Sequence, residues 1–246
     1  MRTFVRSFVV ALVLAAVPAL AEETKELPQV WTGSIGAGLV FTGGNSSTTG
    51  VNLAFDAKYL FSEKSLLNVT GFWIYQSSGG TSTVDKNRAE ARYEAGLTEK
   101  VYAFGEVDYQ RDVFKNVTYL VSPIVGAGYR FIKTKEITLS ADAGIGGAFE
   151  KNPDNAPRSS IAVAFGQSFS YQLGPGTLFN EKFGVLWKTD DTTDYNVHFE
   201  AGVATSVSRR SELKVTYILD YKNMPTGDPP PLRSDSTVLL TFVLKL

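Results

Sequence analysis

The sequence has no cysteine and only one histidine, His198, among its 246 residues. A secreted domain that relies on disulfides carries several cysteines, so strand pairing and side-chain packing must hold this fold together. The usual zinc and copper ligands are almost absent too, and we expect neither a metal site nor a cofactor. The chain has 24 Lys and Arg, 25 Asp and Glu, and a formal net charge of −1. Because there is no basic excess to contact phosphates, we expect no nucleic-acid partner.

Long apolar runs are missing from the body of the chain, where no stretch reaches the length of about 18 residues that a helical membrane span requires. The apolar run at residues 8–17 is also too short to span. It follows Arg2 and Arg6 and precedes a small-x-small sequence that ends at Ala21, before Glu22. That order is typical of a secretory signal peptide cleaved between Ala21 and Glu22. We therefore predict a signal peptide at 1–21, a short periplasmic segment at 22–30 and one domain at 31–246.

From residue 31 onward, apolar residues recur at every second position, which predicts strands with one apolar and one polar face. The segments are about 11–15 residues long, whereas about 5–6 is usual in globular sheets and about 9–11 is enough for a tilted strand to cross a bilayer. We expect twelve strands, at residues 31–42, 50–61, 66–77, 83–97, 101–112, 118–131, 137–149, 159–172, 177–188, 194–207, 212–222 and 235–246.

The connections between these segments alternate in length. They are tight after the even strands, as in Gly174-Pro175-Gly176, and mostly longer after the odd strands, as at residues 78–82, 151–158 and 223–234. Short turns opposite longer loops, together with an even number of strands, are typical of outer-membrane barrels. We therefore predict an all-β fold, a single antiparallel transmembrane β-barrel of twelve strands, with both termini on the periplasmic rim of short turns.

Aromatic residues gather near the strand ends on the apolar face, where two interfacial girdles of a membrane barrel would lie. The alternative is that large residues simply favour strands. The predicted girdle residues are Trp31, Tyr59, Phe61, Tyr109, Tyr119, Tyr129, Phe131, Tyr171, Phe179, Trp187, Tyr195 and Tyr221.

The segment 83–97 shows the two faces most clearly, because charges of largely alternating sign share one face and alanines occupy the other. Such charges cannot point into lipid, so this face is expected to line the lumen. The predicted lumen-lining charged residues are Lys86, Arg88, Glu90, Arg92, Glu94, Glu106, Asp108, Arg130, Asp142, His198 and Glu200, with Asp56, Lys58, Lys182, Lys214 and Asp220 on matching faces.

The sequence does not decide whether this lumen is a passage or is closed. Eight strands leave an interior that side chains fill, and sixteen to eighteen leave a channel, so twelve allow either a narrow hydrated passage or closure by ion pairs. The mixed signs argue against a strongly ion-selective pore. Inward glycines such as Gly38, Gly126 and Gly144 predict close packing beside larger inward side chains.

Several short motifs carry a resemblance to a known family. They are WTGS at 31–34, TGGNS at 42–46, GAGYR at 126–130, LSADAG at 139–144, and an ending with Tyr221, Pro225, prolines at 229–231 and SDST at 234–237. In this order the chain resembles the salt-induced outer-membrane protein family (YdiY-like) over nearly its whole mature length. The resemblance implies an outer-membrane barrel of a Gram-negative bacterium, associated with salt stress and without assigned chemistry. The chain departs from such barrels by ending on Leu246 rather than an aromatic, which puts the terminal assembly signal in doubt.

Catalysis is the first alternative function. Outer-membrane phospholipase A is also a twelve-stranded barrel, and its site resembles a serine hydrolase with a histidine base beside the serine. Here the alternation of the strand places His198 on the lumen face, and no His-x-Ser pattern occurs. We therefore expect His198 to take part in a salt-bridge network instead of acting as a catalytic base. Asp190, Asp191 and Asp194 could contact a divalent cation, but a solvated acidic loop is the favoured reading.

The sequence therefore predicts a non-catalytic outer-membrane barrel, acting as a narrow passive conduit or a structural envelope component under salt or osmotic stress. A lipid-modifying enzyme is the second hypothesis, and a soluble secreted β-barrel that binds a small apolar ligand is the third. The expected partners are outer-membrane lipid and lipopolysaccharide, with periplasmic chaperones and the barrel-assembly machinery during biogenesis.

Overall fold

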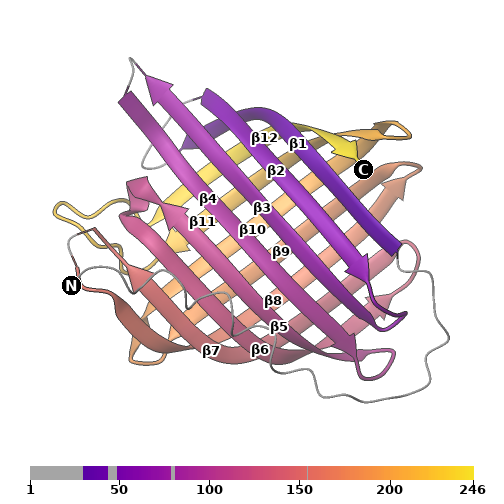
Figure 1. The fold of residues 1–246 in the computed structure, drawn as a ribbon, viewed down its shortest axis with the longest axis horizontal. Helices are drawn as coiled ribbons and strands as arrows, with labels where there is room; N and C mark the ends of the chain where they lie inside the picture. Colours follow the sequence, from indigo (N-terminus) through magenta and orange to yellow (C-terminus); the bar gives the residue numbers. More distant parts are fainter. Residues whose placement is uncertain (1–29, 44–48, 79–80, 154) are drawn as a thin grey trace, which may run out of the picture.

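The computed structural model describes residues 30–43, 49–78, 81–153 and 155–246, and in these ranges twelve antiparallel strands form a closed barrel (Figure 1). The predicted fold class is confirmed. The elements are β1 (Val30–Gly43), β2 (Thr49–Leu60), β3 (Ser65–Ser78), β4 (Thr81–Gly96), β5 (Val101–Asp112), the 3-10 helix η1 (Val113–Lys115), β6 (Val117–Lys133), β7 (Ile137–Lys151), β8 (Arg158–Gly174), β9 (Thr177–Lys188), β10 (Asp191–Ser208), β11 (Ser211–Lys222) and β12 (Ser234–Lys245).

The strand boundaries follow the alternation of the sequence closely. β5 and β9 coincide with the predicted segments, and every other strand begins or ends within three residues of its prediction. β1 starts at Val30, the last residue of the predicted periplasmic segment. The predicted signal peptide, the cleavage site at Ala21 and Glu22, and residues 22–29 lie outside the described residues.

Each strand pairs with its sequence neighbours, and β1 pairs with β12 to close the sheet. The strands of the near and far walls cross at a steep angle, as expected when a sheet is closed with a large tilt (Figure 1). We call the end that carries the connections after even strands, together with the start of β1 and the end of β12, the turn rim. The opposite end is the loop rim.

The loop rim is less uniform than the sequence suggested. A loop was expected at residues 78–82, but β3 runs to Ser78 and β4 begins at Thr81, and these two residues pair. A register shift at Gln76 and Ser77 lets the polar Ser and Thr residues continue the ladder instead of leaving it. That loop prediction is therefore wrong. Longer connections on this rim that are described throughout are 113–116 and 223–233.

The outer face of the barrel is apolar. In β1, Trp31, Ile35 and Leu39 are 58%, 49% and 47% exposed, whereas the inward Val40 is fully buried. Aromatic pairs lie toward both rims, such as Tyr129 with Phe131 at 5.1 Å between ring centroids near the turn rim. Phe165 and Trp187 form an edge-on pair at 5.6 Å nearer the loop rim. None of the helical structure in the described ranges is long and apolar enough to span a membrane.

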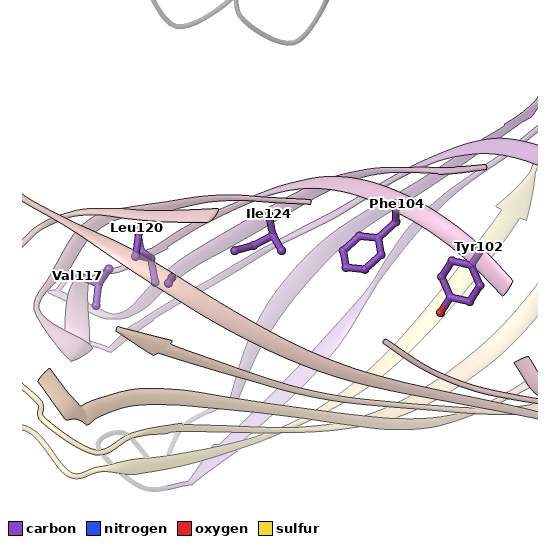
Figure 2. Packing of buried hydrophobic residues seen from close by; sticks show 7 residues of the cluster. Tyr102, Phe104, Val117, Leu120 and Ile124 are labelled. Carbon is purple, nitrogen blue, oxygen red and sulfur yellow. The ribbon is translucent and has the colours of Figure 1, made fainter. Parts of the chain in front are cut away.

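Two apolar clusters occupy part of the interior. The first lies along the inner face of β5 and β6, where Tyr102, Phe104, Ile124, Leu120 and Val117 follow one another in a line toward the loop rim (Figure 2). The second joins β1, β3, β4, β11 and β12 through Val40, Ile74, Val84, Ile218 and Leu239. Polar and charged side chains line much of the remaining interior, and they are the candidates for a functional site.

Candidate functional site

A cavity of about 750 Å³ lies inside the barrel. Its lining contains seven Lys or Arg and seven Asp or Glu side chains, so its formal charge is balanced. Nine of the eleven charged residues that we expected in the lumen line it; Lys86 and Glu200 do not, and each instead binds another inward side chain. The charged lining residues are Asp56, Lys58, Arg88, Glu90, Arg92, Glu94, Glu106, Asp108, Lys115, Arg130, Asp142, Lys182, Asp220 and Lys222.

Arg92 on β4 organises one wall of this cavity. Its guanidinium donates to Glu106 at 2.7 Å, to Asp142 at 2.6 Å and to Glu94 at 3.0 Å. It also lies over the ring of Phe104, 3.9 Å from the centroid. The planar guanidinium suits both roles, because its fixed donors bind several carboxylates while its face stacks on an aromatic ring. Arg92 therefore holds strands β4, β5 and β7 in fixed relation.

Two further arginines extend this arrangement, which we call the arginine wall. Arg88 binds Asp108 at 2.7 Å, and Arg130 binds Glu94 at 2.9 Å while stacking 4.3 Å from the centroid of Tyr102. The sequence indicated the shared parity of these residues but not their pairing. Because each of these ion pairs is short and charge-assisted, the arginine wall presents few free charges to a solute.

Other ion pairs cross the lumen. Lys86 on β4 binds Asp220 on β11, although these strands lie on opposite sides of the closed sheet. The other carboxylate oxygen of Asp220 lies 2.6 Å from Nδ1 of His198. Lys115, at the end of η1, turns inward and donates to the carbonyl oxygen of Asp220 at 2.7 Å, with Asp235 at 3.4 Å. We call Lys86, Lys115, His198, Asp220 and Asp235 the cross-lumen lock.

A second buried network lies at the same end of the barrel. Lys188 binds Glu150 at 2.7 Å and Asp194 at 2.9 Å, and Lys222 approaches Glu150 at 3.4 Å. Asp194 is thus buried inside the rim, so the expectation of a solvated acidic loop is wrong for this residue. Parity could have identified Lys188, Glu150 and Lys222, whereas Lys115 lies in a connection, where alternation gives no information.

Asp190 and Asp191 remain at the surface. Asp190 accepts from Arg158 at 2.7 Å and from Ser160 at 3.0 Å, and the hydrogen bond from Arg158 lowers the pKa of Asp190 below its usual value. Within the described ranges, no group of three His, Cys, Asp or Glu residues is arranged to hold a metal ion.

The exposure of inward lysines differs along the lumen. Side chains of the buried lysines near the loop rim are almost inaccessible, with Lys188 at 1% and Lys115 at 2% exposed. The inward Lys182 and Lys214 are 48% and 37% exposed. Inward charges are therefore hydrated in one part of the lumen and locked together in the other.

His198 has the polar partner of a catalytic base but no nucleophile. Asp220 could orient the imidazole, as a carboxylate does in hydrolase triads. In the described part of the chain, however, no serine or threonine hydroxyl is hydrogen-bonded to His198. The geometry suits a structural link between β10 and β11 rather than a charge-relay site.

Comparisons with known proteins agree with the barrel. A family model described as "Protein of unknown function, DUF481" matches residues 35–245. Among solved structures, the NanC porin is similar with a TM-score of 0.59 at 8% identity, over 87% of this chain and 100% of that chain. An outer membrane channel from Pseudomonas putida F1 is similar with a TM-score of 0.52 at 13% identity, over 94% of this chain and 100% of that chain. None of the curated proteins matches the sequence.

Proposed function

This chain belongs to the DUF481 family of unknown function, and we propose that it forms a narrow, non-catalytic conduit for small hydrophilic solutes in the outer membrane of a Gram-negative bacterium. The observation that carries the proposal is the opposite polarity of the two barrel faces. The outer face exposes large apolar side chains, whereas the inner face holds balanced charges around a cavity. Lipid outside and water inside would satisfy both faces. The two similar structures, which are described as a porin and a channel, support this proposal.

The soluble-binder hypothesis fits these faces poorly. A carrier of apolar ligands needs an apolar interior and a polar exterior, and this barrel has the reverse arrangement. Outward Val125, Ile161 and Phe131 are 63%, 60% and 57% exposed. An apolar surface of this extent in water would drive association with other apolar surfaces.

We propose that the cross-lumen lock closes the lumen in this conformation. This is supported by the ion pair between β4 and β11 and by Lys115, which donates to the carbonyl oxygen of Asp220. We infer that passage requires these pairs to separate. Lys115 is the most suitable residue to test, because its own element is a single turn of 3-10 helix rather than a barrel strand.

The test is single-channel recording of purified protein in a planar bilayer. We expect the wild type to show small or infrequent conductance steps, and Lys115→Ala to show larger or more frequent ones. Lys64→Ala, in the exposed turn between β2 and β3, is the control and should behave as the wild type. Absence of conductance from both the wild type and Lys115→Ala would reject the conduit in favour of a purely structural barrel.

The proposed location makes a separate prediction about processing. The mature protein should begin at Glu22, fractionate with the outer membrane and contact lipid and lipopolysaccharide after delivery by periplasmic chaperones and the barrel-assembly machinery. N-terminal sequencing of the protein from fractionated cells checks this. An intact Met1 on a protein of the inner membrane would contradict it.

We further propose that the conduit serves the envelope under salt or osmotic stress, which the family resemblance supports. Loss of the gene should then slow growth in medium of raised osmolality and leave growth in ordinary medium unchanged. The control is complementation with the wild-type chain. Equal growth of both strains across osmolalities would remove this part of the proposal.

A further inference from the structure

Building on the proposed conduit, we propose that the lumen selects small zwitterionic solutes, in which an ammonium group and a carboxylate are joined by a short carbon chain. The cavity volume of about 750 Å³ is sufficient for such a molecule with several waters.

The balance of charge is the first observation. A pore that selects cations or anions places one sign in excess along its lining. Here acidic and basic side chains line the cavity in equal number. A solute with a net charge of either sign gains no long-range attraction from such a lining, whereas a solute that carries both signs can be matched locally.

The second observation is that only part of the lining has charges available to a solute. The arginine wall is tightly paired, with distances of 2.6–3.0 Å. On the facing wall the pairing is looser: Lys182 lies 3.6 Å from Glu90, and just outside the lining Lys214 lies 3.5 Å from Glu200. Loosely paired lysines can exchange a protein carboxylate for a solute carboxylate without losing short hydrogen bonds.

Asp56 completes this region on the acidic side. It lines the cavity and is exposed, and among the described residues its carboxylate has no hydrogen-bond or ion-pair partner. Lys58 and Lys182 line the same cavity. One free carboxylate among several loosely held ammonium groups offers positions for both ends of a zwitterion.

Solutes of one sign are disfavoured by the same arrangement. An anion that binds Lys182 displaces Glu90 and leaves its carboxylate without the lysine partner, and a cation at Asp56 is repelled by the neighbouring lysines. A zwitterion replaces both partners of a pair, so neither charge is left unmatched. Selectivity then follows from the unpaired group that each wrong solute creates.

Equilibrium binding to the purified barrel in detergent, measured by titration calorimetry, tests this without requiring conductance. Three probes of similar size separate the charges: 4-aminobutyrate, butyrate and n-butylammonium. We expect 4-aminobutyrate to bind about tenfold more tightly than either ion, the effect of one additional charge-assisted hydrogen bond. Equal or tighter binding of a singly charged probe, or no binding of any probe, overturns the inference.

Single substitutions test which residues bind each end of the zwitterion. Asp56→Asn should weaken 4-aminobutyrate and n-butylammonium while leaving butyrate unchanged, and Lys182→Gln should weaken 4-aminobutyrate and butyrate instead. Asp85→Asn is the matched control, because Asp85 binds Arg111 outside the cavity lining. A uniform effect of all three variants contradicts the assignment. Bilayer recordings on the same preparations report separately on the conduit, so binding without conductance rejects the channel alone and conductance without binding rejects the selectivity alone.

Discussion

The orientation of β4 can be tested by one residue on each face. Ala89 lies near the middle of the strand, on the outer face, between Gly71 of β3 and Tyr109 of β5. Ala89→Arg would place a guanidinium near the centre of the bilayer, on the apolar outer face. Lipid-facing arginines at this depth cost about 2–4 kcal/mol, and we expect the free energy of unfolding to fall by that amount.

The adjacent residue should respond differently. Glu90 points into the lumen, its side chain is 16% exposed, and Oε1 of its carboxylate lies 3.6 Å from Nζ of Lys182. Glutamine keeps the shape and can still accept from Lys182, and the pair lies beside the cavity, where solvent screens it. Glu90→Gln should therefore cost about 0–1 kcal/mol.

Reversible urea unfolding in lipid vesicles, followed by the fluorescence of the three tryptophans, measures both changes. Ala89→Leu is the control for added bulk and should be close to neutral, because leucine is favourable in lipid. A shift of one residue in register exchanges the two faces of a strand. If Ala89→Arg proved harmless while Glu90→Gln was strongly destabilising, the faces would be reversed and a membrane barrel with this lumen would be refuted.

Three further predictions concern the interior. Asp220→Asn should lower the free energy of unfolding by about 3–5 kcal/mol, because it leaves buried Lys86 without its counter-charge, and Lys86→Met added to it should recover part of the loss in the same unfolding assay. Gly38→Ala should cost about 1–3 kcal/mol, since its methyl group would meet the backbone of β12, whereas the outward Gly105→Ala has no atom within 4 Å and should be near neutral. His198→Ala should leave phospholipid hydrolysis at background in a lipid-release assay; hydrolysis by the wild type that this change abolishes would establish an enzyme.

The sequence was most informative where one physical rule governed many residues. Alternation identified each strand because a barrel wall has different solvents on its two sides, and a change in register would exchange those sides. The ends were less certain, since residues such as Ser78 and Thr81 suit a turn or a strand equally well. Backbone pairing across the rim decided between them, and it depends on the partner strand rather than on the local sequence.

Parity indicates which face a side chain occupies but not which residue it meets. Lys86 and Asp220 lie on inward faces by alternation, yet they are 134 positions apart, and their contact depends on closure of the whole sheet. Lys115 is harder still to predict. It belongs to a connection, and its inward direction follows from the turn in which Asp112 accepts from the backbone of Phe114 and Lys115.

This difference explains why architecture is so much easier to infer here than function. The apolar face has one requirement, a match to lipid, which many residues satisfy independently. On the inner face the role of each charged side chain depends on its partners. The same arginine, lysine and carboxylate side chains could pair with one another and close the lumen, or remain loosely paired and bind a solute. In this barrel both outcomes occur together, with short pairs around Arg92 and longer ones at Lys182 and Lys214. The loosely paired residues are therefore the ones whose substitution should change solute binding more than stability.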